Sequence, residues 1–198
     1  MIGASWGGLH AVTTLLERLP PGIEREAAFV VAQHRSPESA PGALESLLQA
    51  RTPLPVLEAG DKDPIVPGRL YVAPPDYHLL VEAGSFALSV DERVQFARPS
   101  IDVLFESAAV AYRERVVGIV LTGANADGAA GLAAIKERGG VAIVQDPGTA
   151  ERRTMPDAAI AATVADAVLP LDDIGPFLHG LALGVPAVRP QALEGQGA

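Results

Sequence analysis

This chain of 198 residues lacks several sequence features, and each absence excludes a class of structure or function. It has no cysteine, which excludes disulfides and thiolate metal sites and favours an intracellular location. No Lys/Arg cluster gives it the basic face of a nucleic-acid binder, and its net charge is −9. No stretch approaches the ~20 apolar residues of a membrane span, and no signal-type run opens the chain. We expect a soluble cytoplasmic protein with no nucleic acid as partner and no membrane insertion.

Aromatic residues make up only 5% of the chain and charged residues 20%, against 48% hydrophobic residues. This balance excludes disorder over most of the length. The apolar residues are mainly Ala, Val and Leu, which suits the packing of small side chains between helices and a sheet. The length fits one compact domain with a sizeable core.

Short apolar runs alternate with helical patterns along the chain. The runs are continuous rather than alternating, which is typical of parallel strands covered on both faces. They are residues 28–32, 54–57, 70–73, 116–121 and 141–144, after a very short first strand at Met1 and Ile2. Helices are predicted over residues 8–18, 42–49, 100–112, 126–138, 156–162 and 172–182.

Residues 77–82 and 86–90 flank a Gly-Ser turn and predict a β-hairpin. The predicted fold is therefore α/β: a doubly wound, mostly parallel sheet with helices on both faces and a small antiparallel hairpin. We expect one domain over residues 1–184, and a flexible C-terminal tail over 185–198, where Pro, Gly and Gln are frequent.

The Gly3-Ala4-Ser5-Trp6-Gly7 segment predicts a strand-to-helix turn that exposes the Ser5 hydroxyl. From the turn alone, Ser5 as nucleophile and Ser5 as helix N-cap are equally good interpretations. A dinucleotide fingerprint needs glycine where Ser5 stands, and a phosphate-binding P-loop needs a lysine that is absent. The spacing matches the elbow of α/β-hydrolases, but that fold places several strands ahead of it. A different fold with similar geometry is expected.

A nucleophilic serine needs a base and an acid to orient that base. His34 directly follows a predicted strand, so it shares with Ser5 the carboxyl edge of the sheet, where functional groups collect. His10 and His179 lie in predicted helices, and His78 is interpreted as a rim residue. The alternative for His34 is a solvated loop histidine.

Asp127 is the leading candidate for the acid. It lies in the Gly-rich turn that follows the strand over 116–121. The alternative is that Asp127 only caps the next helix, and other loop carboxylates are present at Asp61, Asp63, Asp76 and Asp146. Three strand ends that converge on Ser, His and Asp favour a catalytic triad more strongly than any one of them.

These residues resemble the catalytic domain of the chemotaxis-receptor methylesterases, the CheB type. The resemblance is carried by segments in the same order along most of the chain. They are Ile2 to Gly8, Ala32-Gln33-His34, Arg98 to Phe105, Leu121 to Gly131, Gln145-Asp146-Pro147 and Met155-Pro156.

The resemblance implies a catalytic Ser5, His34 and Asp127 that hydrolyse γ-glutamyl methyl esters on the cytoplasmic helices of methyl-accepting chemoreceptors. It also implies deamidation of receptor glutamines, and it places Arg98 near the substrate. We expect the backbone N–H groups of Trp6 and the Ala124 region to bind the oxyanion, with no metal and no cofactor.

The chain departs from the family pattern in two respects. Ala124 and Asn125 stand where the family often has Met and Gly. The N-terminal receiver domain of the family has no counterpart in the sequence, so a separate receiver protein is the expected regulator. These departures motivate an alternative, a catalytically weak regulatory or scaffold module of the same fold.

Overall fold

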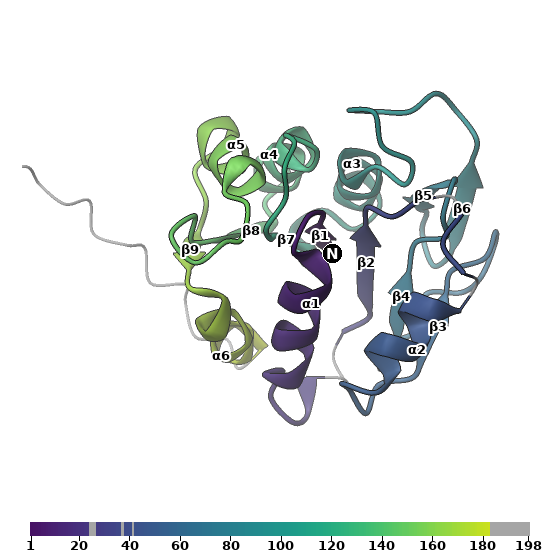
Figure 1. The fold of residues 1–198 in the computed structure, drawn as a ribbon, viewed down its shortest axis with the longest axis horizontal. Helices are drawn as coiled ribbons and strands as arrows, with labels where there is room; N and C mark the ends of the chain where they lie inside the picture. The colour runs from purple at the N-terminus through teal and green to yellow at the C-terminus, as the bar shows by residue number, and fades with distance from the viewer. Residues whose placement is uncertain (24–26, 37, 41, 183–198) are drawn as a thin grey trace, which may run out of the picture.

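The computed structural model describes residues 1–23, 27–36, 38–40 and 42–182 (Figure 1). A seven-stranded sheet with strand order β3-β4-β2-β1-β7-β8-β9 forms its centre. Every neighbouring pair is parallel. The strands are β1 (Ile2–Ala4), β2 (Phe29–Gln33), β3 (Val56–Glu58), β4 (Leu70–Val72), β7 (Val117–Val120), β8 (Val141–Gln145) and β9 (Ala167–Leu169). The predicted parallel sheet is confirmed.

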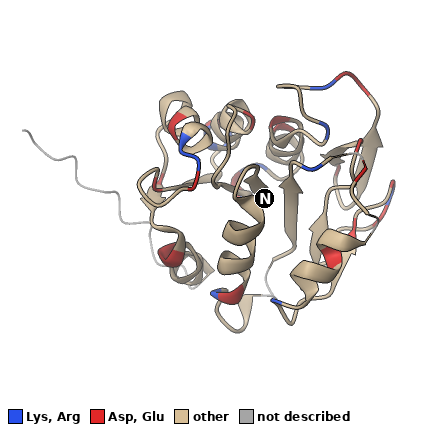
Figure 2. Cartoon of the chain, in the orientation of Figure 1, with Lys and Arg blue, Asp and Glu red and all other residues tan. Residues whose placement is uncertain are grey.

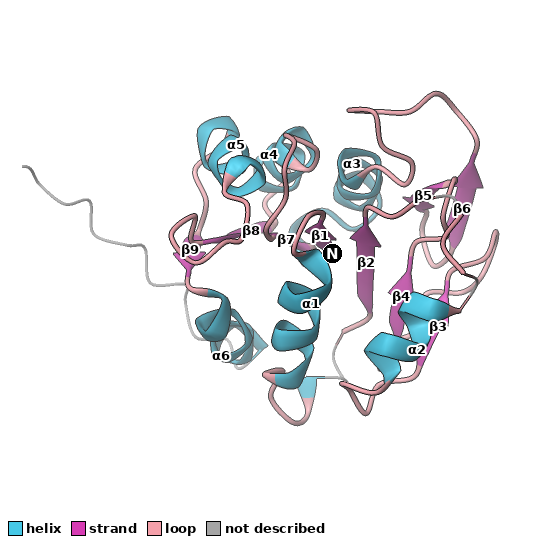
Figure 3. Cartoon of the chain, viewed as in Figure 1, coloured by secondary structure: helices cyan, strands magenta, loops and turns pink. Residues whose placement is uncertain are grey.

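Helices cover both faces of the sheet (Figure 3). One apolar core joins it to α1 (Gly8–Glu17), α2 (Ala43–Gln49) and α6 (Leu171–Ala182). The core on the other face contains side chains of α3 (Ile101–Tyr112), α4 (Ala129–Glu137) and α5 (Thr154–Ala162). The central strands are buried on both faces and carry no Lys, Arg, Asp or Glu in β1 or β2 (Figure 2).

The hairpin lies outside the main sheet. Strands β5 (His78–Val81) and β6 (Phe86–Ser89) pair antiparallel, as predicted, and their buried side chains join the core beside α3. Edge strand β9 and the 3₁₀ helix at Arg113–Arg115 were not predicted, since each has only three residues. Helix α4 begins at Ala129 rather than 126, and α5 begins at Thr154 rather than 156.

The order of the strands determines where a site can form. From β1 the chain adds β2 on one side, passes to the edge strand β3 and inserts β4 between β3 and β2, and it later returns to pair β7 with the other side of β1. The direction of winding thus reverses at β1, and ligands of open α/β sheets bind outside the carboxyl ends of the strands at such a switch point.

Among the described residues, no helix combines the length and apolarity that crossing a membrane requires. The tail predicted over residues 185–198 lies outside the described residues.

Candidate active site

The Ser5 turn lies directly after β1, at the switch point. The N-cap position of α1 is held by Gly7 with a φ of 76°, and no side chain caps the helix. Ser5 is therefore not the N-cap of α1. Its backbone N–H donates to the Thr122 carbonyl at 3.0 Å, and its own carbonyl accepts the Gly8 N–H at 2.8 Å. These bonds attach the turn to the end of β7 and leave the hydroxyl available.

His34 connects this hydroxyl to an acid. Its Nδ1 lies 3.1 Å from Ser5 Oγ, and its Nε2 lies 2.7 Å from Asp127 Oδ2. The ring is mostly buried, with 15% of the side chain exposed. With the proton on Nε2 and directed to Asp127, Nδ1 accepts from the serine. The two ring nitrogens thus have the opposite assignment to the familiar serine-protease arrangement, in which Nε2 faces the serine.

Asp127 is fully buried and accepts four hydrogen bonds. Besides His34, the donors are the Ser100 hydroxyl at 2.8 Å and the backbone N–H groups of Ile101 at 2.7 Å and Asp102 at 2.9 Å. The carboxylate thus lies at the N-terminus of α3, where helix amides stabilise negative charge. Burial raises its pKa, but the bond from His34 and those from α3 outweigh it and hold the pKa below the ordinary value.

A second buried carboxylate mirrors the first. Asp102, in the first turn of α3, accepts the N–H groups of Gly128 and Gly131 through Oδ1, both at 2.8 Å. Asp127 therefore caps α3 while Asp102 caps α4, and the alternative interpretation, in which Asp127 caps the helix after it, is wrong. Burial and the nearby charge of Asp127 raise the pKa of Asp102 to about 6, against the opposing effect of its backbone hydrogen bonds.

His78 lies behind the acid instead of on the rim, where the sequence placed it. It is 2% exposed, its Nδ1 accepts the Ser100 N–H at 3.2 Å, and its Nε2 donates to the Glu92 carbonyl at 3.0 Å. Because Ser100 also donates to Asp127, His78 helps to orient the acid through α3. A histidine at the start of a hairpin is expected to be exposed at the rim of the site. The hairpin packs on α3, however, and this packing buries His78.

Gln33, for which the sequence predicted no role, bonds to the backbone of both Ser5 and His34. Its Nε2 donates to the Ser5 carbonyl at 2.8 Å and to the His34 carbonyl at 3.0 Å. A trans peptide places its C=O and N–H on opposite edges. With the Ser5 carbonyl held by Gln33, the Trp6 N–H therefore points away from Gln33. Its position at the end of β2 and its place in the Ala32-Gln33-His34 segment of the resemblance were the available signals.

The turn after β7 approaches the nucleophile closely. A Cβ built on Gly123 would lie 3.0 Å from Ser5 Cβ and 2.5 Å from Met155 Cε, so only glycine fits without a shift. This close approach brings the following residue, Ala124, to the exposed side of the turn near Ser5. Binding of the oxyanion by the Trp6 and Ala124 backbone stays a prediction that this placement favours.

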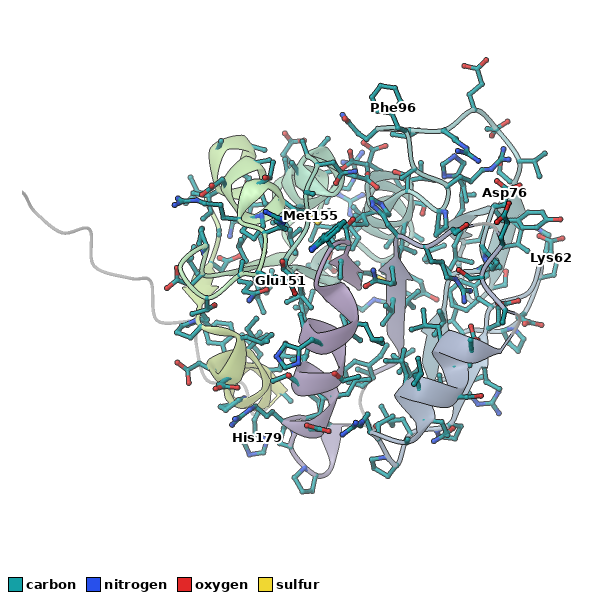
Figure 4. All side chains as sticks on the ribbon, in the orientation of Figure 1. Lys62, Asp76, Phe96, Glu151, Met155 and His179 are labelled. Atoms are coloured by element: carbon teal, nitrogen blue, oxygen red, sulfur yellow. The ribbon has the colours of Figure 1, made fainter. Side chains whose placement is uncertain are left out.

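Trp6 itself has 58% of its surface exposed. Its Nε1 donates to Glu151 at 2.9 Å, and the Arg152 guanidinium lies 5.4 Å from the ring centroid. The buried Thr122 hydroxyl contacts the Trp6 carbonyl at 3.0 Å and accepts the Arg152 N–H at 2.8 Å. The nucleophile turn is thereby joined to the loop that leads into α5, where Figure 4 shows Glu151 and Met155 above the start of α1.

Arg98 lines the cavity beside His34, but its guanidinium is occupied. Nε and Nη2 donate to Asp76 at 3.2 and 2.8 Å, and Nη1 donates to the carbonyls of Val90 at 2.7 Å and Asp91 at 3.0 Å. These bonds hold the 90–98 loop in place. Contact between Arg98 and substrate stays a prediction.

Among the described residues, no three His, Asp or Glu side chains gather as a metal site would require. What the site does contain is a buried acid, an oriented imidazole and an accessible hydroxyl in one hydrogen-bonded row. Such a row is typical of enzymes that transfer acyl groups through a serine ester.

Comparison with known proteins agrees with this chemistry. The family model of the CheB methylesterase matches residues 1–178. A putative protein-glutamate methylesterase/protein-glutamine glutaminase of Leptospira interrogans is 47% identical over 175 residues, which cover 88% of this chain and 89% of that protein. Protein-glutamate methylesterase/protein-glutamine glutaminase 2 of Caulobacter vibrioides is 40% identical over 93% of this chain, which spans 54% of that protein.

The fold has a close counterpart among solved structures. The crystal structure of the Thermotoga maritima CheB methylesterase catalytic domain aligns with a TM-score of 0.85 and 33% identity, covering 91% of this chain and 96% of that one. Family match, identity and fold agree over the same residues. The chain belongs to the CheB methylesterase family.

Proposed function

We propose that this chain is a cytoplasmic serine hydrolase that removes methyl groups from γ-glutamyl methyl esters on the cytoplasmic helices of chemoreceptors. The observation that carries the proposal is the row Asp127–His34–Ser5, with separations of 2.7 and 3.1 Å at the switch point of the sheet. Membership of the CheB methylesterase family and the names of its relatives support this choice of substrate.

In the first half of the reaction, Ser5 Oγ attacks the ester carbonyl while His34 Nδ1 takes its proton. Asp127 keeps the tautomer that presents Nδ1 to the serine and stabilises the imidazolium that forms. The oxyanion accepts hydrogen bonds from the backbone around Trp6 and Ala124. When the tetrahedral intermediate collapses, the C–OCH₃ bond breaks, His34 returns its proton to the leaving oxygen, and methanol departs.

In the second half, water attacks the glutamyl ester of Ser5. His34 Nδ1 again takes a proton and then delivers it to Ser5 Oγ as the acyl–oxygen bond breaks. A glutamate carboxylate and a free enzyme result. A glutamine side chain follows the same route with ammonia as the leaving group, which accounts for the glutaminase activity in the relatives' names.

The test measures methanol released from a methylated receptor cytoplasmic fragment, together with labelling by a fluorophosphonate. We expect Ser5→Ala to lose both signals, with a fall in kcat of about 10⁴-fold or more. Ser46→Ala, at an exposed position of α2, is the control and should match the parent chain. Wild-type methanol release by Ser5→Ala would disprove the proposal. Absence of labelling in the parent chain would favour the scaffold alternative.

A further inference from the structure

An open cavity of about 440 Å³ lies next to the catalytic histidine. Its lining includes His34, Pro99 and Asn125, together with Arg93 and Phe96 of the 90–98 loop. A glutamyl side chain that reaches Ser5 fits a space of this size. The polypeptide that carries this side chain must then lie against the rim, which is formed by the loop.

The tip of this loop has an unusual backbone. Val94 and Ala97 exchange two hydrogen bonds, of 3.2 and 2.9 Å, which close a hairpin with two central residues. Those residues, Gln95 and Phe96, have φ values of 50° and 63°. Hairpin turns of this kind favour Asn and Gly because side chains disfavour positive φ. Strained backbone of this type is found where a function depends on it.

The strain presents an aromatic ring to solvent. Phe96 is 95% exposed, the largest exposure among the large hydrophobic side chains of the described residues. In Figure 4 it stands at the outer end of its loop, away from the core. The ring contributes almost no burial to the fold, so stability does not account for its presence. Exposed aromatic rings beside a cavity mark contact sites for partners.

The loop that carries Phe96 is firmly held at its base. Arg98 bonds to Asp76 and to two carbonyls of the loop, and the buried His78 donates to the Glu92 carbonyl. Through Ser100 the same histidine is connected to the catalytic acid. Phe96 is thus kept in a defined position relative to the site, as a docking residue must be.

The charge around the cavity is of one sign, although the chain as a whole is acidic. Its charged lining residues are Arg35, Arg93 and Arg98, and no described carboxylate lines it. Arg35 and Arg98 are paired with acidic neighbours. Arg93 is 54% exposed and its contact with Asp76 is long, at 3.5 Å, so it is the cation that remains available to a partner.

We propose that Phe96 and Arg93 form a docking surface for the substrate protein. This surface binds an acidic helical segment of the substrate, next to the glutamate that is modified. Phe96 packs on an apolar residue of that helix, and Arg93 pairs with a carboxylate on the same face. The inference rests on the proposed function and adds to it the surface that distinguishes a protein substrate from a free ester.

The experiment compares two substrates, a methylated receptor fragment and p-nitrophenyl acetate. Phe96→Asn removes the ring, and Asn tolerates positive φ, so the turn is kept. We expect KM for the receptor fragment to rise about 10- to 30-fold, as for a binding hot spot, with the rate on p-nitrophenyl acetate unchanged. Phe96→Tyr keeps an aromatic ring, so its KM for the receptor fragment should stay close to that of the parent chain. Val164→Ala, at another exposed apolar residue, is the matched control and should change neither rate.

Arg93→Glu tests the charge. We expect it to raise KM for the receptor fragment and to abolish the loss of affinity that added salt causes in the parent chain. An unchanged KM in Phe96→Asn, or an equal loss on both substrates, would overturn the docking surface. So would sedimentation showing that Phe96→Asn converts a dimer into monomers, because the partner would then be a second copy. Failure of the parent chain to release methanol would instead contradict the proposed function.

Discussion

The two ends of the Asp127–His34–Ser5 row differ in how they are held. Asp127 is fully buried and accepts four hydrogen bonds, three of them from the start of α3. Ser5 is half-buried in an open turn, beside a tryptophan that is 58% exposed. The acid of the proposed triad is thus oriented where water is excluded, and the proposed nucleophile lies where water has access. The difference predicts that a change at the acid end has larger effects than one at the rim.

A second contrast lies within the acid end. Asp127 and Asp102 cap each other's helices, yet only Asp127 touches His34. Their pKa values are shifted in opposite directions. Variants of the two residues therefore distinguish the effect of losing a helix-capping carboxylate from the effect of losing the proposed triad acid.

Among the variants that keep Ser5, the largest effect is expected for Asp127→Asn. The amide nitrogen cannot accept the N–H groups of α3, and the amide no longer selects the tautomer that presents His34 Nδ1 to Ser5. We expect kcat to fall about 10⁴-fold and the free energy of unfolding to fall by about 2–3 kcal/mol. Methanol release and urea unfolding measure the two effects separately.

Asp102→Asn is the matched control for that variant. It removes a helix-capping charge, but the amide oxygen of Asn still accepts the Gly128 and Gly131 N–H groups, so we expect a smaller loss of stability and a loss of kcat of about tenfold or less. Equal losses of kcat in the two variants would show that Asp127 acts only as a helix cap. Its bond to His34 would then have no separate part in catalysis.

A smaller effect is expected for Gln33→Met, which keeps the length of the side chain and removes both of its donated hydrogen bonds. The Ser5 carbonyl then keeps only the hydrogen bond from the Gly8 N–H, so the peptide that directs the Trp6 N–H is held less firmly. We expect kcat to fall about 10²-fold with little change in KM, as when one oxyanion donor is lost. The rate of fluorophosphonate labelling should fall in parallel.

Gln145→Met serves as the control, because Gln145 is equally buried at the end of β8 and bonds to backbone groups of Thr122 and Thr149. We expect a similar fall in the melting temperature but a much smaller change in kcat. If both glutamine variants lost the same activity, Gln33 would be a general support of the fold, with no specific part in catalysis.

The residues that sequence could identify are those at strand ends. Ser5, His34 and Asp127 each follow an apolar run, and a parallel sheet brings such ends together whatever the details of packing. The resemblance of several ordered segments then gave the family. The core strands and both helical layers were predictable for the same reason, since continuous apolar runs indicate strands covered on two faces.

What sequence could not give depends on contacts between distant segments. Asp127 caps α3 across 26 positions of sequence, and no local capping rule detects such a bond. The bonds of the Arg98 guanidinium to Asp76 and to two loop carbonyls join segments that no local pattern relates, and contact between Arg98 and substrate stays a prediction. The three residues of β9 pair only with β8 at the edge of the sheet, too few for a periodicity to show.

The third prediction concerns the pH dependence of stability. The folded pKa of Asp102 is about 6, above its unfolded value, so its contribution to stability is complete below about pH 4 and is lost as pH rises through 6. Asp127 has a lowered pKa and contributes in the opposite sense, with stability lost as pH falls. Urea unfolding of Asp102→Asn should lack the decline through pH 6. A decline that persisted in this variant would assign it to another group.

The smallest effect is expected at the exposed end, for Trp6→Phe. The substitution removes the Nε1–H bond to Glu151 but keeps an aromatic ring beneath Arg152. Because the lost bond is exposed, water replaces it, and we expect the free energy of unfolding to fall by less than about 1 kcal/mol. The backbone of the turn is held by Thr122 and Gln33, so kcat on p-nitrophenyl acetate should stay within about threefold of the parent value. A larger loss of kcat would mean that the tryptophan side chain, and not the buried bonds beneath it, positions the nucleophile.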